Sequence, residues 1–477
     1  MDSFPVQPLK PGLVNLPGAT PASAALVVEL LREDFRAHHC FFNDLLFHDH
    51  LSHHILSLHD LGAPIECIQA MYDMEAAMQR PLHPKGTPET TNKITEENWT
   101  GSLGEKHANM YPDYLAFFSS EIVKHGVTDV LERYLFSPEA NGNGSLMLAR
   151  FLGGVVHPII QAGYGIEFGQ DFVVAQGIAL AAVTDPEAIN LMDAPSGLPE
   201  IKSGPSTTLL ALLREVQESP KLAPKPYEND GRNFAGLVKW FNADPERGAT
   251  IREIYNKWTF NVEEEDFDKK IDECMWQATL LLGATSKPGR KPRMDFFLMH
   301  LLTSGLALRV VLDALRKPLH KAQLLQAYAR SAAMYTLYRG RPRIDPALAM
   351  SYTDLPQPKG ALSDTKTALG MAGGGSPWLA VLNSAALHHE PHVVKAIRGL
   401  FYCAQQYGRT SPGAIIGAVD GDGNETHNGA AKVDGTLFIR VAGVLTDAMG
   451  WVAHGDKERG WDFSGIGWDE TWSSPDT

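Results

Sequence analysis

The chain has 477 residues, of which 44% are hydrophobic and 21% charged, and this composition is typical of a soluble protein that buries a large core. Its 42 basic and 56 acidic residues give a formal net charge of -14, which argues against a nucleic-acid or anionic-membrane surface, because both need clustered positive charge. We therefore expect a small-molecule partner that is not a polyanion, and the composition makes no prediction of the oligomeric state.

The cellular location is predicted from what the sequence lacks. The N-terminus has no basic region followed by an apolar one, and no run approaches the ~20 apolar residues of a membrane helix. The four cysteines lie far apart without paired spacing, so neither a disulfide framework nor a cysteine-based zinc site is indicated. We expect a cytosolic protein.

Helical periodicity runs through nearly the whole chain. Apolar residues recur at three- to four-residue spacing across residues 22 to 39 and 114 to 136. Further helices are predicted at 292 to 316, 391 to 407 and 435 to 451. Residues 292 to 316 are apolar on nearly every side, which indicates a central, buried helix. Long alternating stretches are missing from the sequence, so we predict an all-α fold.

Loops rich in proline and glycine separate these helices, but none is long or charged enough for an interdomain tether. Segments that carry histidines lie on both sides of the loops, and separate domains could not easily share one site. We therefore predict a single helical domain over residues 1–477, with residues 1–22 as an extended N-terminal arm and a site buried among the central helices.

The histidines are unevenly distributed. Seven of the 18 lie between His38 and His59. A neutral imidazole offers a lone pair that binds iron, zinc or copper, and polar rings on apolar helices need a partner. We therefore predict a metal site built from four distant segments. These are Phe47-His-Asp-His-Leu-Ser-His-His54, Gly153-Gly-Val-Val-His-Pro158, Asp295-Phe-Phe-Leu-Met-His-Leu-Leu-Thr303 and His388-His-Glu-Pro-His-Val-Val-Lys395.

The alternative is that each histidine is simply hydrogen-bonded to a backbone carbonyl in the core. No single segment has the short spacing of a zinc finger or the pattern of a zincin. The sequence also lacks a dinucleotide-binding glycine motif, a P-loop and the nucleophile elbow of a hydrolase. If the protein handles O2, a metal is the expected agent, because O2 reacts with few organic molecules unaided.

Three further residues are candidates for catalysis. His392 and Lys395 share one face of a predicted helix, and a deprotonated Lys395 that captures CO2 would become an anionic carbamate ligand. Its alternative is a surface lysine paired with a carboxylate. Glu167, in Gly163-Tyr-Gly-Ile-Glu167 together with Tyr164, could be the anionic ligand instead or could orient an imidazole N–H.

Several of these stretches resemble the signature segments of the questin oxidase-like family, and the resemblance runs from about residue 25 to residue 472. One departure is Asp49-His50, where family members carry an Asn-His pair. The matching stretches are Phe47-His-Asp-His-Leu-Ser-His-His-Ile-Leu-Ser-Leu-His-Asp-Leu-Gly-Ala63, His157-Pro-Ile-Ile-Gln-Ala-Gly-Tyr-Gly-Ile-Glu167, Asp295-Phe-Phe-Leu-Met-His300, His392-Val-Val-Lys395 and Gly460-Trp-Asp-Phe-Ser-Gly-Ile-Gly-Trp-Asp-Glu-Thr-Trp472.

The resemblance implies an iron site of four histidines and a carboxylated lysine. On that basis the expected ligands are His50, His157, His300, His392 and Lys395. Among His50, His53 and His54 we choose His50, since the family pattern places its histidine directly after Asn or Asp. We expect Phe168, Phe296, Phe297, Met299 and Trp378 to wall an aromatic pocket near the ligands.

The function that the resemblance implies is oxidative cleavage of a ring in an anthraquinone-type aromatic polyketide, in fungal-style secondary metabolism. The cofactor would be Fe(II), with O2 as co-substrate and NADPH as an external reductant where one is needed. One alternative is an NADPH-dependent Baeyer-Villiger-type monooxygenase of the same substrates. Others are a hydrolase in which zinc and a carbamate activate water, and a metal-free helical protein that binds aromatic ligands.

Overall fold

The computed structural model describes residues 4–83, 94–187, 189–229, 233–358 and 375–473. In these ranges the chain forms nineteen α-helices, short 3₁₀ helices and isolated β-bridges, with no sheet, so the all-α prediction is confirmed. The helices are α1 Pro21–Ala37, α2 Leu51–Asp60, α3 Ile65–Ala76, α4 Tyr111–His125, α5 Val127–Phe136, α6 Pro138–Asn141, α7 Met147–Phe151, α8 Gly153–Phe168, α9 Asp171–Val183, α10 Leu209–Glu218, α11 Phe234–Asn242, α12 Pro245–Tyr255, α13 Phe267–Gly283, α14 Phe296–Ala314, α15 Pro318–Tyr338, α16 Pro346–Ser351, α17 Pro377–Ala385, α18 Pro391–Tyr407 and α19 Leu437–Met449.

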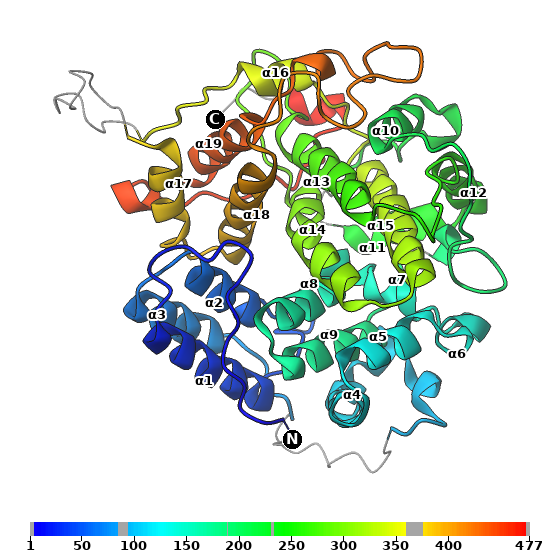
Figure 1. Ribbon diagram of the computed structural model, residues 1–477, viewed down its shortest axis with the longest axis vertical. Coiled ribbons are helices and arrows are strands. Elements are labelled where there is room, and N and C mark those ends of the chain that lie inside the picture. The colour runs from blue at the N-terminus through cyan, green and yellow to red at the C-terminus, as the bar shows by residue number, and fades with distance from the viewer. Residues whose placement is uncertain (1–3, 84–93, 188, 230–232, 359–374, 474–477) are drawn as a thin grey trace.

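Helices α8, α9 and α14 form the centre of the molecule, and α8 packs against both of the others (Figure 1). The contact of α8 with α14 depends on a glycine. A Cβ atom at Gly163 would lie 2.4 Å from Cβ of Ala307, so no larger residue fits at this separation of the two helices. The close approach places the face of α8 that carries His157 beside α14.

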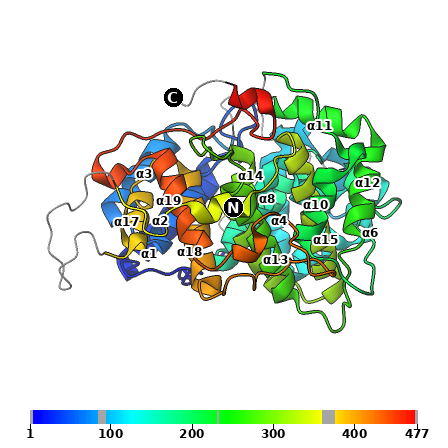
Figure 2. The same ribbon diagram turned by 90° about the horizontal axis from the view of Figure 1, so that it is seen from above.

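The two ends of the chain lie together on one side of this centre. Helix α18 packs against α2, α14 and α19, and both views show the N-terminal helices α1 to α3 beside α17 to α19 (Figures 1 and 2). This packing brings residues near position 50 next to residues near position 392. The buried interior between them is where the sequence predicts the metal site.

From residue 4 the N-terminal arm runs without regular structure. It ends at Thr20 and not at the predicted residue 22, because α1 already begins at Pro21. Thr20 caps the helix by accepting the backbone N–H of Ser23. Further back, the N–H groups of Lys10 and Leu16 donate to the carbonyls of Phe168 and Asp60. The arm is therefore fixed along the ends of α8 and α2.

Two predicted helices differ from the observed ones. The helix predicted over 114 to 136 is broken into α4 and α5 at Gly126, whose φ of 80° lies outside the helical region. The helix predicted from 292 begins at Phe296, because Asp295 acts as its N-cap and pairs with Asp462 in a β-bridge. The helix over 391–407 is confirmed as α18, and that over 435 to 451 forms as Leu437–Met449.

Helix α14 is long and apolar enough to cross a membrane by length and composition alone. In the described part of the chain it is the one helix that passes this test, and 83% of the apolar stretch is buried inside the fold. Its apolar residues therefore face other helices, as in the core of a soluble protein.

Candidate metal centre

Four histidines from four parts of the chain meet inside the helical bundle. His50 lies just before α2, His157 in α8, His300 in α14 and His392 in α18. The Nε2 atoms of His50 and His157 are 2.9 Å apart, and nitrogen atoms of these two and of His392 all lie within 4.8 Å of one another. The ring of His300 is 5.0 Å from that of His157 and 4.9 Å from that of His392.

The backbone and one carboxylate hold three of these rings by their Nδ1 atoms. His157 Nδ1 is 2.6 Å from the Gly154 carbonyl, and His300 Nδ1 is 2.8 Å from the Phe296 carbonyl. His392 Nδ1 is 2.6 Å from Oε1 of Glu390. Because carbonyl and carboxylate oxygens only accept, each Nδ1 carries the proton, and each Nε2 keeps its lone pair for the space between the helices.

The donor set fits a metal ion. Two imidazole nitrogens that bind one ion at about 2.1 Å and at a right angle are about 3 Å apart, which agrees with the pair formed by His50 and His157. Nε2 of His300 and Nε2 of His392 are buried and make no hydrogen bond within the described residues. Buried polar atoms without a partner are rare unless they bind something else.

Burial and neighbouring charges keep the imidazoles neutral. Burial is the main cause that lowers the pKa of His50, His157 and His300 well below the usual value, and Lys395 and neighbouring imidazoles lower it further. The pKa of His392 is lowered by burial and by Lys395, although Glu390 opposes the shift. Neutral imidazole is the form that binds metals.

Lys395 lies in α18 one turn after His392 and is 2% exposed. Its Nζ atom makes no hydrogen bond with any described residue, and burial lowers the pKa of the amine to about 8. The alternative of a surface lysine paired with a carboxylate is therefore wrong. The position is compatible with the expected carbamate, which remains a prediction.

Glu167 does not face the imidazoles. Its carboxylate accepts the N–H of Leu13 at 2.7 Å and a hydrogen bond from Arg398, which also donates to Asp60 at 2.7 Å. The carboxylate thus fixes the N-terminal arm against α18. A role for Glu167 in orienting a ligand histidine is not what the structure shows, and Glu390 has that position instead.

Tyr164 also lies behind the cluster rather than in it. Its hydroxyl is 2.6 Å from Oγ of Ser57, and its ring stacks on His53 at 5.3 Å. His54, the other alternative to His50, is turned away and contacts Glu75 through Nδ1. Of the three neighbouring histidines, His50 makes the closest contact with His157.

The aromatic wall is only partly as expected. Phe296 lies 4.9 Å from the ring of His300 and 4.8 Å from that of His392, and it stacks on Phe463 at 4.6 Å. Of the other expected residues, Phe168 stacks on Tyr164, Phe297 on Phe234, and Trp378 packs against Phe401. Phe463 was not expected, because the segment that carries it is far from α14 in sequence.

Two further contacts were missed. Trp461 donates its indole N–H to Glu390, which also caps α18 by accepting the N–H of His392. Burial alone would raise the pKa of Glu390, but His392, Trp461 and Lys395 together lower it to about 2. An acidic residue before Pro391 at the first helical position was a usable sign of a helix cap.

The second missed contact is that of His48, whose ring stacks on the ring of His157 with the ring centres 4.0 Å apart.

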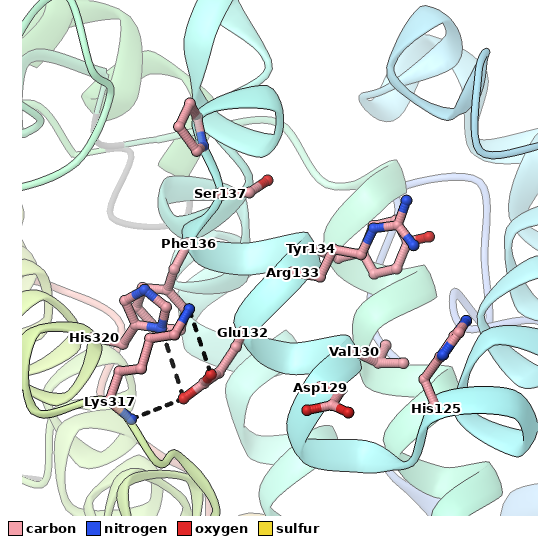
Figure 3. Close-up of a pocket in the computed structure, with 11 residues that line it drawn as sticks. His125, Asp129, Val130, Glu132, Arg133, Tyr134, Phe136, Ser137, Lys317 and His320 are labelled. Atoms are coloured by element: carbon pink, nitrogen blue, oxygen red, sulfur yellow. Dashed lines mark hydrogen bonds and ion pairs between the residues drawn. The ribbon is translucent and has the colours of Figure 1, made fainter.

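A cavity of about 480 Å³ lies elsewhere, between α5 and the start of α15 (Figure 3). None of the candidate ligands lines it. Its Glu132 carboxylate accepts the N–H groups of Arg316 and Lys317, and its His320 ring stacks on Phe136. The cavity shares no lining residue with the cluster of histidines and lies apart from the metal centre.

The fold and site together define an all-helical protein with a buried centre of neutral imidazoles beside a lysine. The sequence model of the questin oxidase-like family matches residues 47–400, and the chain belongs to this family. The match includes all five predicted ligands. Recognition of the family from the histidine segments is therefore confirmed.

Three relatives bear the names of oxidases or of an oxidoreductase. The chain is 29% identical over 351 residues to Baeyer-Villiger oxidase AgnL3 of Paecilomyces divaricatus, which covers 70% of this chain and 74% of the relative. It is 24% identical over 451 residues to questin oxidase of Aspergillus terreus, and this match covers 93% of this chain and 91% of the relative. It is 27% identical over 403 residues to oxidoreductase AflY of Aspergillus parasiticus, and this match covers 83% of this chain and 75% of the relative. The chain is an oxidoreductase.

Proposed function

We propose that this protein is a non-haem iron-dependent oxygenase that uses O2 to cleave a ring of an anthraquinone-type aromatic polyketide. The observation that carries the proposal is the convergence of His50, His157, His300 and His392 around buried lone pairs, with Lys395 beside them. The oxidase names of the relatives support the reaction class and the substrate class.

Residues of the protein orient the imidazoles for metal binding. Gly154, Phe296 and Glu390 hold imidazole N–H groups, so the opposite nitrogens point inward as donors. Iron bound there would supply the electron transfer that lets O2 react with an organic molecule. Carboxylated Lys395 would offset part of the ion's charge with an anionic oxygen ligand.

Aromatic residues beside the centre suit a planar substrate. Phe296 contacts His300 and His392 and also stacks on Phe463, and both phenylalanines are partly exposed. A fused aromatic ring system can stack on such rings with the part to be oxidised next to the imidazoles. NADPH would act as an external reductant of the substrate or the metal, because the sequence has no dinucleotide-binding motif.

The first test is metal content. Purified protein reconstituted with Fe(II) under anaerobic conditions should retain about one iron per chain after desalting, as expected for one site with a closed donor set. His157→Ala and His300→Ala should lose both the iron and substrate-dependent O2 uptake. His389→Ala is the matched control, because the side chain of His389 is 58% exposed and contacts Glu458 rather than the cluster.

Full iron occupancy in both alanine variants would contradict the assignment. A yellow preparation with a flavin spectrum, or a saturable high-affinity NADPH site, would instead favour the Baeyer-Villiger route that the names of several relatives describe. Zinc content with O2-independent turnover would favour a hydrolase.

A further inference from the structure

Helix α8 begins with an unusual turn directly before His157. Gly154, Val155 and Val156 have φ angles of 57°, 51° and 58°, all in the left-handed region. Two of the three are β-branched residues, for which this conformation crowds the side chain against the backbone. Such a turn persists only if the surrounding structure holds it.

Glu187, in the segment after α9, is the group that holds it. Its Oε1 atom accepts the N–H of Val155 at 3.3 Å, and its Oε2 atom accepts the O–H of Tyr335 in α15 at 2.7 Å. The residue is 8% exposed, and both of these donors to its side chain are neutral groups. Burial raises the pKa of Glu187 to about 7, although the bonds from Tyr335, Val155 and Gly154 oppose this shift.

The turn controls His157 in two ways. It aims the Gly154 carbonyl at Nδ1 of His157, 2.6 Å away, which leaves Nε2 of the same ring facing Nε2 of His50 at 2.9 Å. It also makes room for His48, because a Cβ atom at position 154 would lie 2.7 Å from Nε2 of His48. His48 stacks on the His157 ring with an interplanar angle of 5°. Both the tautomer and the orientation of His157 thus depend on the turn.

We propose that Glu187 is a positioning residue for the metal centre: it anchors the left-handed turn of residues 154–156 and thereby fixes the tautomer and direction of His157. This role rests on the proposed function, since it requires His157 to be a ligand. Glu187 acts through the backbone and does not touch the imidazole.

The test is a titration with Co²⁺, whose visible absorption reports imidazole ligation, at pH 8 so that the carboxylate form of Glu187 dominates. In Glu187→Gln the side chain has one carbonyl oxygen in place of the two carboxylate oxygens. It therefore cannot accept both the N–H of Val155 and the O–H of Tyr335 as Glu187 does. It should weaken Co²⁺ binding about 10- to 100-fold, the usual effect of losing a group that orients a ligand. Tyr335→Phe should weaken it less, in the same direction. Tyr338→Phe is the matched control, because its buried hydroxyl has no partner among the described residues, and Co²⁺ binding should be unchanged.

A double-mutant cycle separates positioning from general destabilisation. His157→Ala should keep only weak Co²⁺ binding through the remaining histidines, too weak to survive desalting but measurable by titration at high Co²⁺ concentration. In that background Glu187→Gln should cause no further loss of Co²⁺ affinity, because the ring that it positions is gone. An equal loss in both backgrounds, or unchanged affinity of Glu187→Gln alone, would overturn the positioning role. If Glu187→Gln does not fold, the same cycle is run with Tyr335→Phe and decides in the same way. Failure of the wild-type protein to bind Co²⁺ would instead count against the proposed function.

Discussion

Lys395 is buried, has no hydrogen-bond partner among the described residues and lies one turn from His392. A lysine in such a place is costly as a cation, and burial already lowers the pKa of its amine to about 8. A sizeable neutral fraction at mildly alkaline pH can react with CO2, and the product would be an anion facing four imidazoles. On this proposal, the charge of the metal centre would depend on whether Lys395 is carboxylated.

We predict that Lys395→Ala weakens iron binding by at least about tenfold, even though it removes a positive charge, because an anionic ligand is lost. Lys395→Glu should restore part of the affinity with a shorter carboxylate. Wild-type affinity should rise with added bicarbonate, and that of both variants should not. The measurement is the Fe(II) dissociation constant by chelator competition.

Lys270→Met is the matched control for this prediction. Lys270 is also buried, but its amine donates to Ser206 and to the carbonyl of Thr259 at 3.0 Å. Its loss should lower thermal stability and leave iron affinity unchanged. Wild-type metal binding and turnover in Lys395→Ala would contradict the carbamate.

Residue type and spacing pointed to four histidine-bearing segments, because an isolated imidazole on an apolar helix face is conspicuous in the sequence. The choice of His50 and His392 within the two segments that contain several histidines came from the family resemblance. The carboxylates were harder to assign. Glu167 lies on the same helix as His157 yet bonds to Arg398, whereas Glu187 and Glu390 support His157 and His392. Which carboxylate supports which histidine depends mainly on tertiary packing, and the period of a helix contains no information about that packing.

At the scale of elements, the contact between α8 and α14 decides the geometry of the site, because these helices carry His157 and His300. At Gly163 the two helices approach too closely for a Cβ atom. A Cβ atom there would lie 2.4 Å from Cβ and 2.6 Å from Cα of Ala307. These neighbours belong to a helix backbone and a short side chain, neither of which can rotate away.

We predict that Gly163→Ala lowers the free energy of unfolding by about 1–3 kcal/mol, the usual cost of overpacking a core, and lowers iron affinity as the two helices separate. Gly142→Ala is the control, since a Cβ atom there meets nothing within 4 Å and its φ is not positive. Urea denaturation of the metal-free proteins and iron titration measure the two effects. Equal stability of the two variants would show that the helices adjust without cost.

Helices with a clear start signal were predicted well, and interrupted ones were not. Pro391 after an acidic cap defines the start of α18, and the predicted range of 391–407 is the observed one. The α4 and α5 pair continues one apolar pattern across Gly126, so periodicity alone could not reveal the break. Helix α14 begins at Phe296 because Asp295 caps it, which is a local signal that the predicted start at 292 overlooked, and Asp295 also pairs with the distant Asp462.

For the whole molecule, buried neutral histidines outside the metal centre make stability depend on pH. Burial, with Arg80, lowers the pKa of His39 to about 4, and burial, with Arg214 and Arg343, lowers that of His427 to about 4. In the unfolded chain both titrate near 6.5. Below that pH the unfolded state binds more protons than the folded state, so stability is lost as the pH falls toward 4.

We predict that each of these two histidines costs about 2 kcal/mol of stability at pH 5 relative to pH 7.5. The measurement is the urea midpoint of the metal-free protein at the two pH values. The double variant His39→Gln/His427→Gln should show a smaller difference between them. His454→Gln is the control, because His454 lies in a partly exposed short helix. An unchanged pH dependence in the double variant would assign the acid sensitivity to other groups.

The ligands of the proposed centre also lie far apart in the order in which a ribosome makes them. At about 5–20 residues per second, the roughly 340 residues between His50 and His392 take on the order of 20–70 s to synthesise. Trp461, which holds Glu390, follows later still. His157 and His300 are made during that interval, but the set of ligands stays incomplete until α18 with His392 and Lys395 has been made. The nascent chain therefore cannot select its metal, and the choice of ion is left to the completed fold and to the ions that the cell supplies at that moment.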